Sequence, residues 1–136
     1  MPKQTQDIRW KQRFSNLEKA FLRLKEAMDK TELNELERNG LVQRFEFTLE
    51  LSWRTMKDFL EEQGFKFKPS PKDTLRQASE SGYIDCAQEL IDGIEIRNEL
   101  AHDYDGEKFL ESEPTLRNET YPAIQKLILF FKSNLY

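Results

Sequence analysis

Three residues with chemically useful side chains lie close together in the second half of the sequence. These are Arg97, Asn98 and His102, and His102 is the only histidine of the chain. An arginine guanidinium offers a planar fork of donors that fits a phosphate, and a histidine can take up or release a proton near neutral pH. An asparagine amide can orient a ligand or the imidazole. Together the three side chains suit a phosphodiester or a nucleotide, with Arg97 binding the phosphate and His102 transferring the proton.

The number of histidines in one chain indicates that two copies of the chain act together. Cleavage of RNA through the ribose 2′-hydroxyl is best served by a general acid and a general base, and one chain supplies one histidine. A twofold dimer would bring two histidines and two arginines into a shared cleft. We therefore expect a homodimer that takes RNA or a nucleotide as its ligand. Because each chain has one histidine and one cysteine, Cys86, neither a His-based metal cluster within one chain nor an intrachain disulfide is expected, and no cofactor is implied.

The helix that must position these residues is expected to begin at Ile84 or Asp85. Its apolar positions recur every three or four residues, and the stripe consists of Ile84, Ala87, Ile91, Ile94, Asn98 and Ala101. Asn98 is thus predicted to face the core, with Arg97 beside the stripe and His102 about 40° around the helix from Asn98, one turn on. Gly93, inside the helix, lowers helix stability by about 1 kcal/mol relative to alanine. Close approach of another backbone or a ligand commonly offsets this loss. The alternative interpretation is that these polar side chains are hydrogen-bonded structural groups.

The rest of the sequence predicts further helices joined by short loops. Apolar residues spaced by three and four indicate a helix from about Ile8 to Lys30 and another in the C-terminal region, which Pro122 should kink or divide. Thr31 is the expected N-cap of a second helix that runs to about Gln63, before Gly64. A short helix begins with Ser70 as its N-cap and Pro71 in its first turn and ends near Gly82.

One stretch of this pattern is ambiguous. Residues 45–53 alternate between apolar and polar types, which is the period of a strand, and residues 65–68 could form its partner. A helix is favoured because Leu, Glu and Arg flank the stretch on both sides without turn residues. The expected fold class is then all-α: an antiparallel up-and-down helical bundle of four long helices plus a short one, forming a single domain over residues 1–136.

Composition narrows the class of protein further. The chain of 136 residues is 38% apolar and 34% charged, which excludes a disordered chain, and its 17 leucines against one valine favour helix. No apolar run approaches the ~20 residues that span a bilayer, and no signal-peptide region is seen, so we expect no membrane contact and a cytoplasmic location.

The charge distribution limits how the chain could bind nucleic acid. The net charge is −4, and residues 84–136 carry 5 Lys and Arg against 11 Asp and Glu. A generic nucleic-acid binder would carry a basic excess. Contact with RNA must therefore be local or built with another subunit. Local cations that could compensate for the acidic surroundings are Lys66, Lys68, Lys72 and Arg76, and the alternative is that they form a solvated surface.

Three blocks of sequence resemble a known family. Residues 97–104 match the R-N-x-x-x-H-x-Y signature of the HEPN superfamily, and most resemble its branch of nucleotidyltransferase substrate-binding proteins, which includes HepT-type toxins. Residues 45–53 are similar to the Phe-Glu-x-x-x-Glu-x-x-Trp pattern of that branch, and residues 71–78 to its short helix led by a proline. The resemblance covers residues 8–132, and it favours a helix over residues 45–53.

The resemblance implies a specific function. It implies a helical bundle that dimerises through its motif helices, with a metal-independent ribonuclease site at Arg97 and His102, supported by Asn98, in the dimer cleft. It implies that Tyr104 accepts AMP from a small partner nucleotidyltransferase that acts as the antitoxin. The alternative is a non-catalytic subunit that binds a nucleotide or substrate for the nucleotidyltransferase. Gly93 stands where a larger apolar residue is common in the family, which could alter the cleft.

The position of Tyr104 in the sequence is physically compatible with attachment of AMP. It follows His102 by two residues in an acidic turn that also holds Asp103 and Asp105. A nucleotide attached there would add negative charge and bulk beside the cleft and would repel an RNA backbone. The alternative is a tyrosine whose ring packs against the end of the helix.

Overall fold

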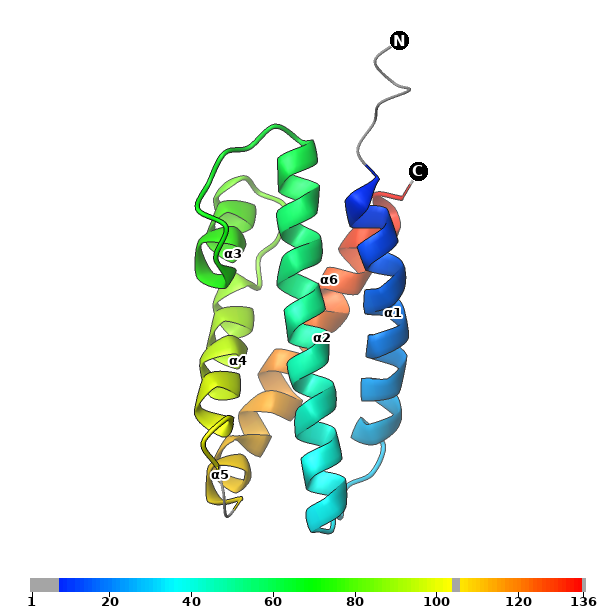
Figure 1. The fold of residues 1–136 in the computed structure, drawn as a ribbon, viewed down its shortest axis with the longest axis vertical. Helices are drawn as coiled ribbons and strands as arrows, with labels where there is room; N and C mark the ends of the chain where they lie inside the picture. The colour runs from blue at the N-terminus through cyan, green and yellow to red at the C-terminus, as the bar shows by residue number, and fades with distance from the viewer. Residues whose placement is uncertain (1–7, 104–105, 136) are drawn as a thin grey trace.

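The chain folds into a bundle of helices that run up and down. The computed structural model describes residues 8–103 and 106–135, and these contain helices and no strand. The elements in chain order are α1 (Arg9–Met28), α2 (Glu35–Glu62), α3 (Pro71–Glu80), α4 (Ala87–Leu100), α5 (Glu107–Thr115), the π-helix η2 (Leu116–Thr120) and α6 (Tyr121–Ser133). In Figure 1, α1 descends beside α2, α2 ascends, and α4 descends on its other side. The expected all-α bundle is confirmed.

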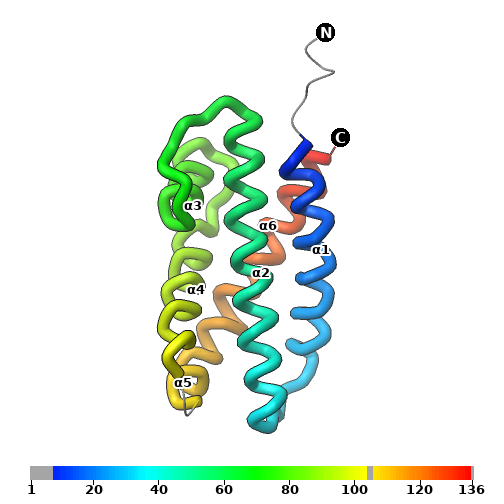
Figure 2. Tube along the Cα trace, in the orientation of Figure 1, coloured from blue at the N-terminus to red at the C-terminus, as the bar shows by residue number. Residues whose placement is uncertain are grey.

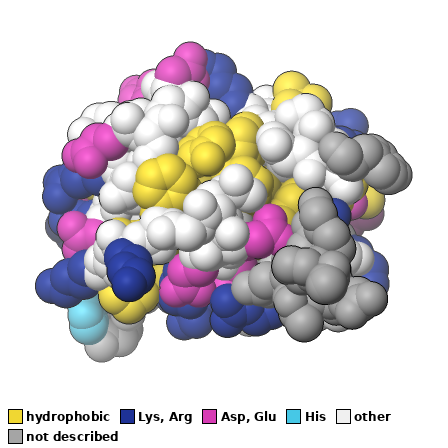
Figure 3. Space-filling view, turned by 90° about the horizontal axis from the view of Figure 1, so that it is seen from above, with side chains coloured by type: hydrophobic (Ala, Val, Ile, Leu, Met, Phe, Trp, Pro, Cys, Tyr) yellow, Lys and Arg dark blue, Asp and Glu magenta, His cyan; other side chains and the backbone are white. Residues whose placement is uncertain are grey.

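The C-terminal helical region closes the bundle from behind. Figure 2 shows α5 at the lower end and α6 crossing behind α2 toward the start of α1. Phe131 of α6 contacts Trp10 and Phe14 of α1, with ring centroids 5.6 and 5.4 Å apart. Viewed from this upper end, hydrophobic side chains form a band across the surface (Figure 3).

The ambiguous stretch 45–53 is helical throughout, inside α2. The strand alternative is therefore wrong, because a helical register buries Phe45 and Leu49 together on one face. The predicted N-cap Thr31 is also wrong. Asn34 caps α2 instead: its side chain accepts from the amide N–H of Glu37 at 2.8 Å, and the Glu37 carboxylate accepts from the amide N–H of Asn34 at 3.0 Å. This reciprocal pair satisfies two amide groups that would otherwise lack partners.

The starts of α3 and α6 follow from a cap and a proline, whereas α4 begins without a side-chain cap. Ser70 accepts from the amide N–H of Asp73 and Pro71 stands in the first turn, so the predicted start of α3 is confirmed. The next helix begins at Ala87 rather than at Ile84 or Asp85. The predicted division at Pro122 is confirmed, since α6 starts at Tyr121 after the π-helix. A proline at 122 lacks the N–H that would continue the preceding hydrogen-bond pattern.

Gly93 has a packing role that the sequence only partly indicated. A Cβ built on Gly93 would lie 2.6 Å from Cγ2 and 3.1 Å from Oγ1 of Thr120, which is buried in η2. The close neighbour within the chain is thus a side chain rather than a backbone. Because threonine is stiff at χ1, Gly93 fixes how closely α4 approaches η2, and with it the rotation of the helix that carries Arg97.

None of the described helices is long and apolar enough to cross a membrane.

We predict that Gly93→Ala destabilises the fold by about 1–3 kcal/mol, since the added methyl overlaps Thr120. Thr120→Ser in the same chain removes Cγ2 and should recover part of the loss. Gly40→Ala is the matched control, because Gly40 lies in α2 with nothing within 4 Å of its Cβ position; it should stabilise by up to about 1 kcal/mol. Denaturant unfolding measures all three variants. A Gly93→Ala chain as stable as the Gly40→Ala chain would contradict the packing role.

Candidate functional site

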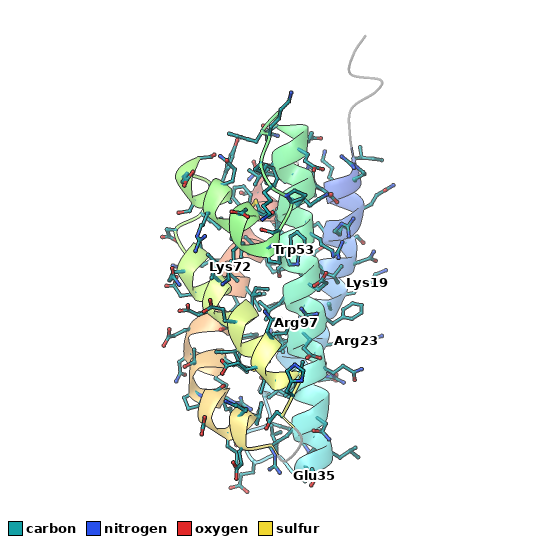
Figure 4. The ribbon with its side chains drawn as sticks, turned by 60° about the vertical axis from the view of Figure 1, so that its left-hand side comes forward. Lys19, Arg23, Glu35, Trp53, Lys72 and Arg97 are labelled. Atoms are coloured by element: carbon teal, nitrogen blue, oxygen red, sulfur yellow. The ribbon has the colours of Figure 1, made fainter. Side chains whose placement is uncertain are left out.

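Arg97 is held between α4 and α2. Its side chain is 38% exposed, and Nη2 lies 3.7 Å from Oε1 of Glu50 on α2. Figure 4 shows Arg97 beside α2, on the same side of the molecule as Trp53. The guanidinium is therefore restrained at one edge, while more than a third of the side chain still faces solvent. An arginine in this state keeps donors for an external anion.

The Glu50 carboxylate, which is ion-paired with Arg97, also accepts hydrogen bonds from two residues of its own helix. Oε1 accepts from Nε1 of Trp53 at 3.4 Å, and Oε2 accepts from Nε of Arg54. The guanidinium of Arg54 also lies over the Trp53 ring, 5.1 Å from its centroid. Glu50, its two donors Trp53 and Arg54, and the ion-paired Arg97 form what we call the Glu50 network.

Two opposing effects set the pKa of Glu50. Burial by itself raises the pKa of this carboxyl, but the hydrogen bonds from Arg54 and Trp53 and the charges of Arg54 and Arg97 outweigh it. The pKa of Glu50 consequently lies below its ordinary value of 4.5. The carboxylate is thus ionised at neutral pH and remains an anchor for Arg97.

The other two predicted site residues face solvent. Asn98 and His102 are both exposed, so the expectation that Asn98 faces the core is wrong. The inner side of α4 instead passes through Gly93, the half-buried Arg97 and the buried Leu100. Asn98 lies about 100° around the helix from Arg97.

His102 follows the end of the helix, in a turn where its amide N–H donates to the Glu99 carbonyl at 3.1 Å. Within the described part of the chain, no hydrogen bond links Arg97, Asn98 and His102 to one another. One chain thus presents the three groups on one segment without joining them into a closed site.

The turn after His102 is anchored by Asp103, a role that the sequence analysis missed. Its carboxylate accepts from the amide N–H groups of Lys108 at 3.0 Å and Phe109 at 2.9 Å, in the first turn of α5. An acid near the start of a helix is a capping signal that could have been recognised. Tyr104, the expected AMP acceptor, lies outside the described residues.

A polar pocket of about 410 Å³ lies beside this turn. Asp103 and Gly106 line it from one side, and α2 contributes Arg38, Asn39 and Glu46. The pocket therefore joins the end of residues 97–103, which we call the motif segment, to the first half of α2.

Other candidate groups are restricted in what they can do. Lys72, one of the local cations that could compensate for the acidic surroundings or simply form a solvated surface, is paired with Glu95 at 2.8 Å. Burial raises the pKa of the Cys86 thiol to about 11, so this cysteine is a poor nucleophile. No group of three or more His, Cys, Asp or Glu side chains in residues 8–103 and 106–135 is arranged to hold a metal ion.

Comparison with known proteins identifies relatives over nearly the whole chain. The model of the family described as "nucleotidyltransferase substrate binding protein like" matches residues 12–132. The crystal structure of a protein from Thermus thermophilus is similar, with 28% sequence identity and a TM-score of 0.67, over 88% of this chain and 98% of that one. No curated protein matches.

We predict that Glu50→Gln destabilises the chain by about 1 kcal/mol at pH 7, because a neutral amide binds the two arginines less strongly. The pKa of Glu50 is lowered by folding, so its contribution is complete above the ordinary value of 4.5 and is lost as the pH falls through the lower folded value. The difference between wild type and variant should therefore shrink below about pH 4.5.

The measurement is urea unfolding at pH 7 and at pH 3.5. Glu99→Gln is the matched control, since Glu99 lies on α4 and pairs with Lys108 at 3.7 Å while largely exposed; it should change stability little. Equal effects of the two substitutions at pH 7 would contradict a special role for Glu50.

Proposed function

Because the chain belongs to the nucleotidyltransferase substrate binding protein like family, we propose that it is the partner subunit of a small nucleotidyltransferase. We further propose that it resembles HepT-type toxins in being a metal-independent ribonuclease. The observation that carries this proposal is the placement of Arg97. Its guanidinium is ion-paired with Glu50 yet partly open to solvent, on the segment that also exposes Asn98 and His102.

The reaction needs two copies of the chain. In a homodimer that meets along α4, one His102 removes the proton of the ribose 2′-hydroxyl and O2′ attacks the phosphorus. The other His102 gives a proton to the leaving 5′-oxygen, which leaves a 2′,3′-cyclic phosphate and a 5′-hydroxyl. Arg97 stabilises the charge on the phosphate, and Asn98 supports the site. The absence of hydrogen bonds among these three groups in a single chain agrees with a site that is completed by a second copy.

The partner nucleotidyltransferase would silence this site by placing AMP on Tyr104. The described neighbours of Tyr104 support this regulatory role, since Asp103 and Gly106 line a pocket open to solvent beside the motif segment. A phosphate added near it would repel the RNA backbone from Arg97 and His102.

A second candidate function is a non-catalytic subunit that binds nucleotide or substrate for the nucleotidyltransferase. The description of the family favours it, and the exposed Arg97 could hold a phosphate without any reaction.

We predict that the purified protein cleaves RNA in the presence of EDTA and that His102→Ala lowers the rate at least about 100-fold. The readout is product analysis for a 2′,3′-cyclic phosphate, with Gln88→Ala, an exposed α4 residue away from the motif, as control. Absence of cleavage at high protein concentration, together with firm binding to a nucleotidyltransferase, would support the second candidate instead.

We also predict that co-expression with the partner nucleotidyltransferase raises the intact mass by whole AMP units. Tyr104→Phe should abolish the gain because the acceptor hydroxyl is lost. Tyr121→Phe is the control, since it keeps the ring that stacks on Phe21 at 5.6 Å. A full mass gain in the Tyr104→Phe chain would exclude Tyr104 as the acceptor.

A further inference from the structure

A groove between α1 and α2 combines the groups that bind single-stranded nucleic acid. Its volume is about 600 Å³, and its lining includes Asn16, Lys19, Arg23, Gln43, Arg44 and Phe47. Three of these side chains are cationic and none of the lining residues is acidic, although the chain as a whole has a net charge of −4. The charge of the groove therefore suits an anionic ligand.

Two of the cations are available to such a ligand. Lys19 and Arg23 are exposed and form no ion pair with any described residue, whereas Arg44 donates to the Arg23 carbonyl at 2.7 Å and contacts Glu26 at 3.3 Å. Lys19 and Arg23 are also four residues apart on α1, where like charges repel each other across one turn. A bound phosphate would remove this repulsion and pair with both.

The wall formed by α2 presents an aromatic ring to the same groove. Phe47 is 63% exposed, although its neighbour Phe45 is only 2% exposed. A base can stack on such a ring while its phosphate lies on the cations. The exposed amides of Asn16 and Gln43 could then bond the edge of the base.

The groove adjoins the Arg97 site across α2. Phe47 precedes Glu50 by three residues, which places them one turn apart on the surface of α2, and Glu50 binds Arg97. Figure 4 shows Lys19, Arg23 and Arg97 on the same side of the molecule, with α2 between them.

We propose that the α1–α2 groove binds a segment of single-stranded RNA next to the phosphate held by Arg97, with one base stacked on Phe47. The inference rests on the proposed ribonuclease function and adds a substrate-binding surface to it. A protein partner fits less well, because Phe47 is the only large exposed apolar side chain among the lining residues.

The test is fluorescence anisotropy with a 12-nucleotide 2′-O-methyl oligouridine, whose blocked 2′-oxygen prevents cleavage. Arg23→Glu should weaken binding at least about tenfold, because it replaces a phosphate contact with a repulsive charge. Lys25→Glu makes the same change of charge on an exposed residue of α1 outside the groove, and should weaken binding less than about threefold. Phe47→Ala should weaken the affinity for the oligouridine between about 5-fold and 100-fold. Phe47→Tyr keeps the ring and should bind with the wild-type affinity. Thermal unfolding confirms that each variant is folded.

The outcomes separate the groove from the nuclease. If Arg23→Glu and Phe47→Ala bind RNA as wild type does, the groove proposal is overturned, and cleavage that still depends on His102 leaves the nuclease in place. If these variants no longer bind the nucleotidyltransferase but still bind RNA, the groove is a protein-docking surface and the proposal is likewise overturned. If binding depends on the groove while no RNA is cleaved in EDTA, the groove stands and the nuclease fails.

Discussion

The shared carboxylate of Glu50 is the interaction on which the candidate site depends. An arginine at the surface of a helix normally samples many rotamers, and ordering it costs conformational entropy. Here folding offsets part of this entropy cost, because Glu50 forms an ion pair with Arg97 of α4. Glu50 also accepts hydrogen bonds from Trp53 and Arg54 of α2. The ion pair thereby keeps the guanidinium near α2 before any ligand arrives. The Glu50 network also joins α2 to α4, so the same contact supports both the candidate site and the packing of the bundle.

A second constraint fixes where α4 presents its side chains. Gly93 allows Thr120 of η2 to approach α4 closely, and Leu100 closes the buried side at the end of the helix. Since Arg97 lies between them along this side, it points toward α2, while Asn98 is turned to solvent. Asp103 then holds the following turn against α5 through two amide hydrogen bonds. The motif segment is thus supported at both ends by packing and by capping.

Much of this arrangement could be predicted from the sequence, and the exceptions have physical reasons. Periodicity identified the helices, and the capping chemistry of Ser70 located the start of α3. Thr31 and Asn34 are both good N-caps, and the choice of Asn34 depended on its reciprocal bond with Glu37. The spacing of apolar residues predicted that Asn98 would face the core. The buried side of α4 lies elsewhere, because contact with η2 determines it. Glu50 could not be paired with Arg97 in advance, since that contact exists only when α2 and α4 pack.

The central claim is that the site is shared between two copies of the chain, and subunit mixing tests it most directly. In this account a dimer of one wild-type chain and one His102→Ala chain lacks either the general acid or the general base and is inactive. When wild-type chains are mixed with an excess of His102→Ala chains and allowed to exchange subunits, ribonuclease activity should therefore fall well below the level expected from the wild-type fraction alone. If activity stays proportional to the wild-type fraction while exchange is verified by mass spectrometry, the shared site is contradicted.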